Sequence, residues 1–279
     1  MPDLSSTEAE NILAGVIIPP RPSIVSAIMD EQGRSDPDLG RIGQLIGNDV
    51  GLAAAVLKTI NSPLYGLRRQ VGSIDQAVMM LGMKNVSSLV MGLALRSNIP
   101  SAGLDRFWDS ATRTALASSY LANTLGCGSR EDAHLFGLFH DCAIPLLMQR
   151  FPDYKETLAL ANRAGDRVFT DIEDERHQTN HTVVGSLLAS NWKLPEHLRE
   201  GILYHHDPSV FELGLPALTV NLIATMYLAE SIENGFSRLA TDAQWDRTVP
   251  RAMAHLMIDH EALEELAKDT LEMLNASGL

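Results

Sequence analysis

The sequence predicts an all-α fold, and three observations support that prediction. Apolar residues recur at spacings of three and four through most of the chain, as at Val86, Leu89 and Leu93, which is the period of a helix with one buried face. Alternation of apolar and polar residues, typical of a half-buried strand, does not extend over any useful length. Proline, glycine and capping residues divide the periodic segments into short helices.

A first helical group is expected over residues 19–98. Prolines mark two of its helix starts, because proline fits the first turn of a helix, where its missing N–H group is not needed. Aspartate and serine mark two others, because their side chains can accept hydrogen bonds from free backbone N–H groups. The expected boundaries are a start at Pro19-Pro20-Arg21-Pro22, a start at Ser35-Asp36-Pro37, a helix from Asp49 to about Ile60, a helix from Ser73 to Gly82, and a helix from Met83 to Leu95.

A second helical group is expected to begin at about residue 104. The preceding turn-rich segment, residues 99–103, contains proline, serine and glycine and marks an internal boundary. The helices expected after it are 104–125, 130–150, 153–164, a short one near 170–177, 181–192, 195–205, 216–234, and two within 242–279.

Composition and charge exclude several classes of protein. The 279 residues are 45% hydrophobic and 20% charged, as in a soluble globular chain with a sizeable core. The net charge is −13; residues 1–100 carry 8 basic and 9 acidic residues, and residues 101–279 carry 14 and 26. No run of basic residues is longer than Arg68-Arg69, so nucleic-acid binding is not expected.

The expected cellular location and the state of the cysteines follow from motifs that the sequence does not contain. No run approaches the ~20 apolar residues that cross a bilayer, and the first residues do not resemble a secretory signal. Cys127 and Cys142 lie too far apart for a CxxC redox pair or a zinc knuckle. We therefore expect a cytoplasmic protein with buried, free thiols and no membrane partner.

Histidines of the second group form the candidate metal site. His140-Asp141 lies on one expected helix, His181 begins another, and His205-His206 ends a third. Imidazole and carboxylate groups suit Fe, Mn or Zn, and helical bundles build metal sites from facing helices. Two interpretations stay open: the residues hold one divalent ion weakly, or they form a polar cluster that satisfies its own hydrogen bonds. The other histidines are expected to be ordinary core or surface residues, namely His134, His177, His197, His255 and His260.

A second candidate contact lies in the first group. Asn61 and Tyr65 belong to a turn that follows a helix, where asparagine suits the helix end and tyrosine can anchor the loop. Arg68-Arg69 is the only pair of adjacent cations and could meet an acidic partner or a phosphate. For each of these residues the structural interpretation competes with the functional one.

The ordered motifs resemble those of HDOD proteins, the bacterial HD-related output domains. The matching motifs are Ile18-Pro19-Pro20-Arg21-Pro22-Ser23, Asn61-Ser62-Pro63-Leu64-Tyr65-Gly66, Ser73-Ile74-Asp75-Gln76-Ala77, Leu81-Gly82, Phe107-Trp108, Phe139-His140-Asp141, His181-Thr182-Val183-Val184-Gly185, Trp192-Lys193-Leu194-Pro195 and His205-His206-Asp207-Pro208. The resemblance covers about residues 18–215. It implies a fold in which an N-terminal helical bundle packs on a degenerate HD-phosphohydrolase-like helical bundle, and a role in signalling.

This resemblance also divides the chain. Residues 1–17 form an N-terminal segment, and residues 18–215 form the HDOD domain. Within that domain, 18–98 is the N-terminal bundle and 104–215 the HD-like bundle. Residues 216–279 are C-terminal helices that complete or flank the HD-like bundle.

Departures from active HD enzymes argue against catalysis. Their first histidine ligand corresponds here to Ser110, and a hydroxyl is a poor substitute. The glycine and lysine that follow the HD pair in the catalytic HD-GYP subclass correspond to Ala143 and Ile144. The helix expected to carry a late aspartate ligand, 216–234, contains no Asp. The site is therefore expected to be catalytically inactive, with no required cofactor and at most one divalent ion.

Three functions compete at this stage. The first is a non-catalytic regulatory module that acts through protein partners. The second is a sensor that binds a small ligand in the relic HD cleft, since a lapsed active site can keep its cavity. The third, which the departures oppose, is a metal-dependent phosphohydrolase of nucleotides or cyclic dinucleotides.

Overall fold

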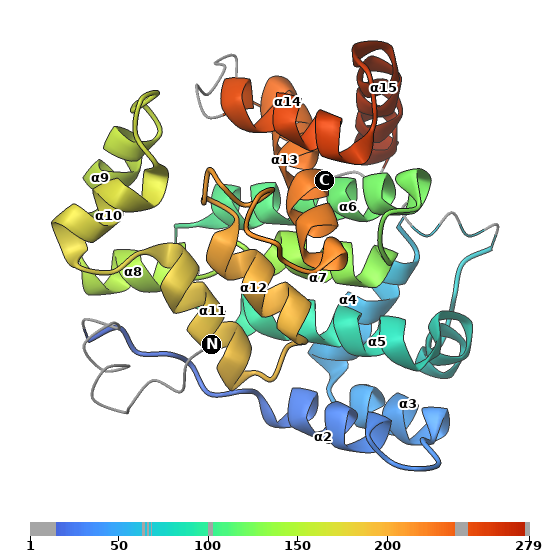
Figure 1. Ribbon diagram of the computed structural model, residues 1–279. Helices are drawn as coiled ribbons and strands as arrows, with labels where there is room; N and C mark the ends of the chain where they lie inside the picture. The colour runs from blue at the N-terminus through green and yellow to red at the C-terminus, as the bar shows by residue number, and fades with distance from the viewer. Residues whose placement is uncertain are drawn as a thin grey trace.

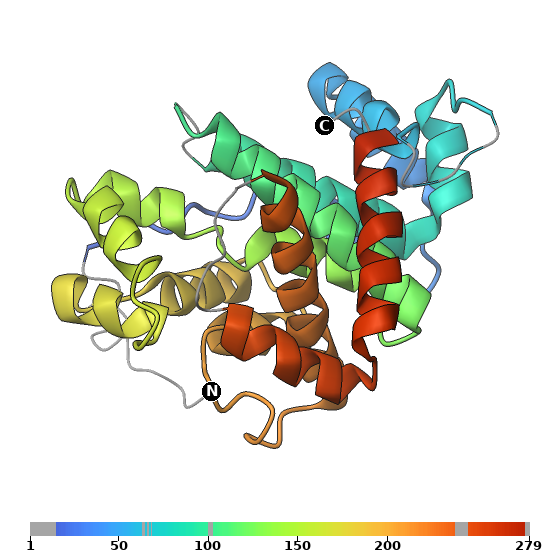
Figure 2. The ribbon, with the colours of Figure 1, turned by 90° about the horizontal axis from the view of Figure 1, so that it is seen from above.

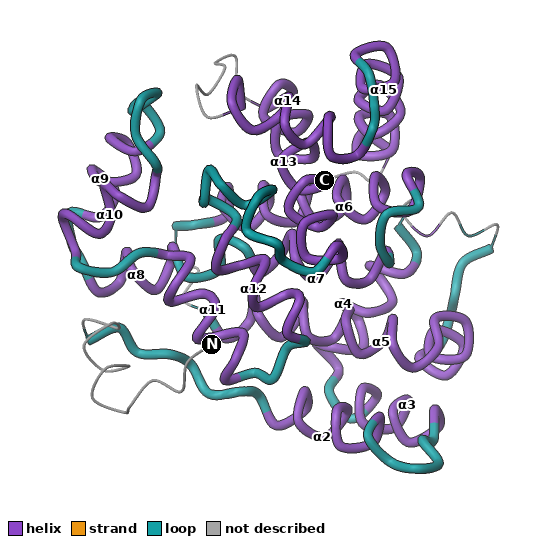
Figure 3. The backbone as a smooth tube through the Cα atoms, viewed as in Figure 1, coloured by secondary structure: helices purple, strands orange, loops and turns teal. Residues whose placement is uncertain are grey.

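The structure, a computed structural model, is a bundle of helices (Figure 1). It describes residues 15–62, 65, 67, 69–99, 103–237 and 245–276, with side chains described up to residue 234 in the fifth of these ranges. Every regular element in these ranges is a helix, and none is a strand (Figure 3). The predicted all-α class is therefore confirmed.

The first group of helices lies before residue 100, and the second follows it. The first group consists of α2 (Ser23–Gln32), α3 (Leu39–Gly47), α4 (Val50–Ile60) and α5 (Ile74–Asn98). The second consists of α6 (Asp105–Leu125), α7 (Arg130–Phe139), α8 (Ile144–Arg150), α9 (Tyr154–Ala161), α10 (Phe169–His177), α11 (His181–Asn191), α12 (Glu196–Tyr204), α13 (Ala217–Ser237), α14 (Trp245–Leu256) and α15 (His260–Ala276).

Local sequence explains the helix ends in the first group. The Asp49 side chain accepts a hydrogen bond from the Leu52 N–H, and the Ser73 side chain accepts one from the Gln76 N–H. Both are the expected N-caps. Gly82 has φ of 74° and interrupts α5, so the expected end of a helix at this glycine is also found, as a kink between two helical segments.

Two expected boundaries were wrong. The helix announced by Pro37 begins only at Leu39, because the Asp38 side chain caps it by accepting from the Gly40 N–H. The expected helix 130–150 is broken between α7 and α8, because a turn closes there and Pro145 opens a new helix. Apolar periodicity continues through this turn, which is why the sequence pattern did not reveal it.

Two main hydrophobic cores stabilise the two groups of helices, and a third, small cluster of Ala161, Phe169 and Ile172 joins α9 and α10. The smaller core lies among α2 to α5 and includes Ile42 and Val56. The larger core occupies most of the second group and extends to Leu274 of α15, so the C-terminal helices belong to the same core as α6 and α7. Helix α5 contributes residues to both cores, Val86 to the smaller one and Leu95 to the larger one. Figure 2 shows α15 lying along the second group beside α6, which it contacts.

One described helix, Ile74–Asn98, is long and apolar enough to cross a membrane. It is kinked at Gly82, and half of its most apolar window is buried within the protein. It packs against α2, α3, α4 and α7. These contacts are those of a core helix.

The backbones of α6 and α7 approach each other closely next to the site. A Cβ atom placed on Gly137 of α7 would lie 2.6 Å from the Cα atom of Ala115 in α6. Glycine therefore lets the two helices touch through their backbones. This contact fixes the position of the chain that follows α7, where His140 and Asp141 lie.

Candidate metal centre

The candidate ligands come from three places in the second group. His140 and Asp141 lie in the turn after α7, His181 is the first residue of α11, and His205 and His206 directly follow α12. The expectation that His140-Asp141 lies within a helix was wrong. In that turn the Cys142 N–H donates to Phe139 O and the Ile144 N–H donates to Asp141 O, which releases the two side chains from helical geometry.

Side chains at the start of α11 hold His181 in place. Asn180 caps the helix by accepting from the Val183 N–H at 3.0 Å, and its amide donates to Asp174 at 2.9 Å. The Thr182 hydroxyl also donates to Asn180. This cap fixes the first turn of α11, and with it the direction of the His181 ring.

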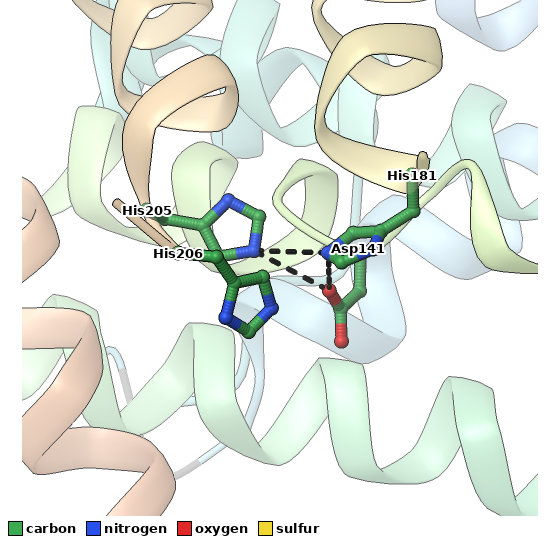
Figure 4. A group of neighbouring side chains, drawn as sticks. All are labelled: Asp141, His181, His205 and His206. Atoms are coloured by element: carbon green, nitrogen blue, oxygen red, sulfur yellow. Dashed lines mark hydrogen bonds and ion pairs between the residues drawn. The ribbon is translucent and has the colours of Figure 1, made fainter. Parts of the chain in front are cut away.

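Asp141, His181 and His205 point toward one another (Figure 4). The Nε2 atom of His181 lies 3.3 Å from Asp141 Oδ1 and 3.3 Å from Nε2 of His205, and His205 Nε2 lies 3.6 Å from the same carboxylate oxygen. Bonds of ~2.0–2.1 Å to a tetrahedral ion place ligand atoms about 3.3 Å apart. The spacing of these three atoms is that of ligands around one small ion.

Hydrogen bonds to the opposite ring nitrogens set the tautomers. His205 Nδ1 lies 2.8 Å from Ile202 O, and His181 Nδ1 lies 2.7 Å from Glu173 Oε2. A carbonyl and an ionised carboxylate only accept, so both Nδ1 atoms carry the hydrogen. In the neutral rings Nε2 is then a bare lone pair. Two such lone pairs and a carboxylate oxygen of Asp141 converge, an arrangement that needs a cation, either a metal ion or a proton, between them.

Glu173 and Tyr154 form the support of His181 and were missed in the sequence. Glu173 is fully buried in α10 and accepts hydrogen bonds from His181 and from the Tyr154 hydroxyl. A carboxylate behind a ligating histidine fixes its orientation and raises its basicity. Glu173 lies on a different helix from His181, so no helical spacing in the sequence links the two residues.

A second group shares Asp141. His140 Nε2 lies 3.1 Å from Glu230 Oε1 of α13 and 3.6 Å from Asp141 Oδ2, while its Nδ1 donates to Gly137 O at 2.8 Å. Each ligand group has its atoms within 4.8 Å of one another: Asp141, His181, His205 and His206 in the first, and His140, Asp141 and Glu230 in the second. The five candidate residues therefore form two adjoining groups and not one shell.

Glu230 corrects one argument made from the sequence. Helix 216–234 contains no Asp, as noted, but its glutamate supplies the carboxylate that was thought to be missing. Glu233, one turn further along α13, accepts a hydrogen bond from Ser110 at 3.1 Å and pairs with Arg113 at 3.4 Å. Ser110 therefore bonds to a carboxylate at the edge of the site and belongs to neither ligand group.

The buried histidines and carboxylates of this cluster shift one another's pKa values. Burial alone would lower the pKa of His140, but Asp141 and Glu230 raise it to about 9. Burial alone would raise the pKa of Asp141, but the histidines around it hold that pKa well below its usual range. Burial lowers the pKa of His205. Asp141 is thus an anion that faces three imidazoles, of which His140 and His181 have raised pKa values and His205 a lowered one.

His206 has a different place from the other ligands. Its ring stacks on Phe169, with centroids 4.9 Å apart and an interplanar angle of 9°. Burial and the neighbouring His205 and His181 lower its pKa well below the ordinary value. The neutral ring can contribute a ligand from the rim of the first group, and it also lines the cavity above.

A cavity of about 290 Å³ opens over the cluster. His140, Asp141, His206 and Glu230 line it together with Ser110, Ile144 and Arg106. Ala143 is fully buried in the larger core, and Ile144 presents an apolar side chain at the position that carries lysine in the HD-GYP subclass. The cavity therefore retains the carboxylates and imidazoles but has no lysine there.

The remaining sequence candidates lie elsewhere. Asn61 clamps its own loop, since its amide donates to Leu57 O and Val71 O and its carbonyl accepts from the Val71 N–H. Tyr65 is half-buried and packs against both cores. Arg69 is exposed, and Arg68 lies outside the described residues. The two cysteines are free, Cys142 being buried and Cys127 partly buried.

The other histidines lie outside the metal-ligand groups, and three of them have partners of their own. His177 bonds to Thr157, His197 pairs with Asp132, and His255 bonds to Asn221. Among the described residues, none of these histidines, nor His134 or His260, belongs to a metal-ligand group.

Comparison with protein families and sequences gives two findings. A family model for the HDOD domain matches residues 18–208. An uncharacterized protein of Treponema pallidum is 27% identical over 220 residues, which are 75% of this chain and 42% of that protein. The chain thus spans less than half the length of this relative.

Solved structures with the same fold include three helical proteins. A Shewanella amazonensis protein provisionally named a phosphohydrolase has a TM-score of 0.70 and 25% identity, with coverage of 95% of this chain and 96% of that one. An HDOD domain protein of unknown function from Geobacter sulfurreducens has a TM-score of 0.69, 24% identity and 98% coverage of both chains. A Marinobacter aquaeolei protein provisionally named a signal transduction protein has a TM-score of 0.68 and 23% identity, with coverage of 93% of this chain and 58% of that one.

Proposed function

This chain belongs to the HDOD domain family, and from that membership we propose that it is a non-catalytic regulatory module of bacterial signal transduction whose histidine–aspartate cluster binds one divalent transition metal ion. The observation that carries the proposal is the convergence of the His181 and His205 Nε2 atoms and the Asp141 carboxylate at ligand spacing. Nitrogen ligands from imidazole together with one carboxylate suit Fe, Mn or Zn. His181, His205 and Asp141 would hold the ion, with His206 at its rim.

The proposal of a non-catalytic role rests on the cleft around these ligands. Ser110 is hydrogen-bonded to Glu233 and stands apart from the ligand groups. Ile144 lines the cavity with an apolar side chain. A hydrolase needs groups that bind the phosphate and stabilise its developing charge, in addition to a metal. The cluster supplies metal ligands, but Ile144 stands where the catalytic HD-GYP subclass has a lysine.

Hydrolysis is therefore expected to stay at background. Purified protein supplied with Mn, Fe, Mg or Zn should not hydrolyse nucleotides, phosphomonoesters or cyclic dinucleotides, as measured by phosphate release and by chromatography of the products. Turnover that disappears in His140→Ala would contradict the non-catalytic proposal. That control separates activity of this site from a contaminating enzyme.

Metal affinity is expected to rise with pH. Burial alone would lower the pKa of His181, but the carboxylates of Glu173 and Asp141 raise it above its ordinary value. A protonated imidazole cannot bind a metal ion, so protons compete with the ion until the pH exceeds this raised pKa. Zinc competition with a fluorescent chelator should show tighter binding at about pH 8 than at about pH 6. An affinity that does not change over this range would argue against His181 as a ligand.

The alternative of catalysis is favoured by one specific observation, Glu230. This glutamate restores a carboxylate on α13 beside His140, and the resulting groups share Asp141 as a bridge. The structural neighbour from Shewanella amazonensis carries a provisional phosphohydrolase name. The hydrolysis assay above distinguishes this alternative from a regulatory role.

The output of the module is proposed to pass through protein partners. A cavity of about 290 Å³ with Arg106 at its wall also suits a small anionic ligand that would modulate those contacts. The contact predicted at Arg68-Arg69 stays a proposal. Confinement to the cytoplasm, without nucleic-acid or membrane partners, likewise stays a proposal that agrees with the net charge of −13.

A further inference from the structure

A second cavity, of about 240 Å³, lies between the two helical groups. Its walls come from α4 and α5 on one side and from α6 and α7 on the other. It shares no lining residue with the cavity over the metal centre. Whatever occupies it would contact both groups at once.

Polar side chains from three helices face this cavity without partners. They are Asn85 and Ser88 of α5, Ser119 of α6 and His134 of α7. None of them forms a hydrogen bond with another described residue. Ser119 is only 3% exposed, whereas Asn85, Ser88 and His134 are partly exposed. Because polar groups in a cavity wall are hydrogen-bonded either to protein or to what fills the cavity, these four side chains offer donors and acceptors to its occupant.

The electrostatic character of the cavity is neutral. Burial lowers the pKa of His134 to about 4, so the ring is uncharged near pH 7 and offers one donor and one acceptor. Burial raises the pKa of Tyr65 to about 12, so its hydroxyl stays protonated. Arg130 and Glu131, the charged lining residues, are adjacent and of opposite sign. The wall therefore favours an uncharged ligand over a phosphate or a carboxylate.

The rest of the wall is apolar. Ile60, Leu81 and Leu89 line the cavity together with the polar groups. The volume is below the ~300–1,000 Å³ of sites for drug-sized ligands. A compact molecule with apolar faces and several donors and acceptors on its edge matches both properties.

We propose that this cavity binds a small, uncharged nitrogen heterocycle of the size of a nucleobase, through Asn85, Ser88, Ser119 and His134. The amide, the two hydroxyls and the neutral imidazole each can donate and accept, as the edge of such a ring does. The apolar side chains cover the ring faces. The site is distinct from the metal centre and does not depend on metal binding.

Helix α7 connects this cavity with the metal centre. His134 lies within α7, and the same helix ends directly before His140 and Asp141. Arg130, at the start of α7, also lines the cavity. A ligand in the cavity would therefore contact the helix that directly precedes the turn with His140 and Asp141.

The test is calorimetric titration of the full chain with adenine, hypoxanthine, cytosine and uracil as separate probes. We expect at least one probe to bind the wild type at millimolar or lower concentration. Ser119→Ala removes one buried hydroxyl with little change of volume and should weaken that binding about five- to tenfold. Ser88→Phe places a ring in the cavity and should abolish it.

Ser118→Ala is the matched control. Ser118 is the neighbouring residue of α6, is also fully buried, and has an unpaired hydroxyl, but it does not line the cavity. Its affinity for the probe should equal that of the wild type, and its melting temperature calibrates the loss of a buried hydroxyl. The proposal is overturned if no probe binds the wild type, which would leave water as the occupant, or if Ser119→Ala and Ser118→Ala bind alike. Metal content should be unchanged in Ser119→Ala, so this result is independent of the proposed function.

Discussion

Replacing Gly137 with alanine is expected to lower the free energy of unfolding by about 3 kcal/mol, because the new methyl group meets backbone and not a side chain. It would lie 2.6 Å from the Cα atom and 3.0 Å from the N atom of Ala115. Neither atom can rotate away, so α6 and α7 must move apart and loosen the packing of the larger core. Urea unfolding followed by circular dichroism measures the loss.

Gly92→Ala provides the control for that experiment. Its methyl group would lie 2.5 Å from Leu138 Cδ1, the end of a side chain that can change rotamer. Both glycines lie inside helices, so alanine brings the same gain in helix propensity, about 1 kcal/mol, at each position. We expect Gly92→Ala to cost less than half as much as Gly137→Ala. Equal losses would mean that the backbone contact with Ala115 has no special importance.

Glu173→Gln is expected to weaken metal binding about 10- to 100-fold while the protein stays folded. The amide keeps the size of the side chain but removes the negative charge that orients His181 and raises its basicity. The Tyr154 hydroxyl can still donate to the amide oxygen, so the loss should fall on the metal more than on the fold. Zinc competition with a chelator, together with the melting temperature, separates the two effects.

Glu175→Gln is the matched control on the same helix. Glu175 is 65% exposed and pairs with Arg167 at the surface, a contact that contributes little to stability. Its metal affinity should equal that of the wild type. If the two variants bind zinc alike, Glu173 has only a structural role and the orientation of His181 is set by its N-cap alone.

Much of the fold could be predicted from the sequence because it depends on local signals. Periodicity gave the helices, and Asp49 and Ser73 marked their starts through caps that need only nearby N–H groups. The turn that carries His140 was missed, because apolar residues continue on both sides of it. The hydrogen bonds of that turn and Pro145 at the start of α8 show where the helix ends.

Some residues of the candidate site could be predicted from the sequence, and others could not. His181 and His205 were identified because the chain has only 9 histidines, and because several of them begin or end neighbouring helices together with Asp141. Glu173 and Glu230 were missed because they are two of 35 acidic residues and lie far from their histidines in sequence or on another helix. On helix 216–234 the expected ligand was an aspartate, whereas the structure places Glu230 there. Tertiary structure supplies the pairing that no spacing could reveal.

The most direct test of the account is the metal content of the purified chain, measured by plasma mass spectrometry after reconstitution with Fe, Mn or Zn and removal of loose ions. The account predicts close to one equivalent of a divalent ion in the wild type and none in the double variant Asp141→Ala/His181→Ala, with both proteins helical by circular dichroism. A stoichiometric metal retained by the double variant would place the site elsewhere. A wild type that takes up no metal would leave the cluster as a set of polar residues that hold a proton, and would contradict the metal-binding function proposed for it.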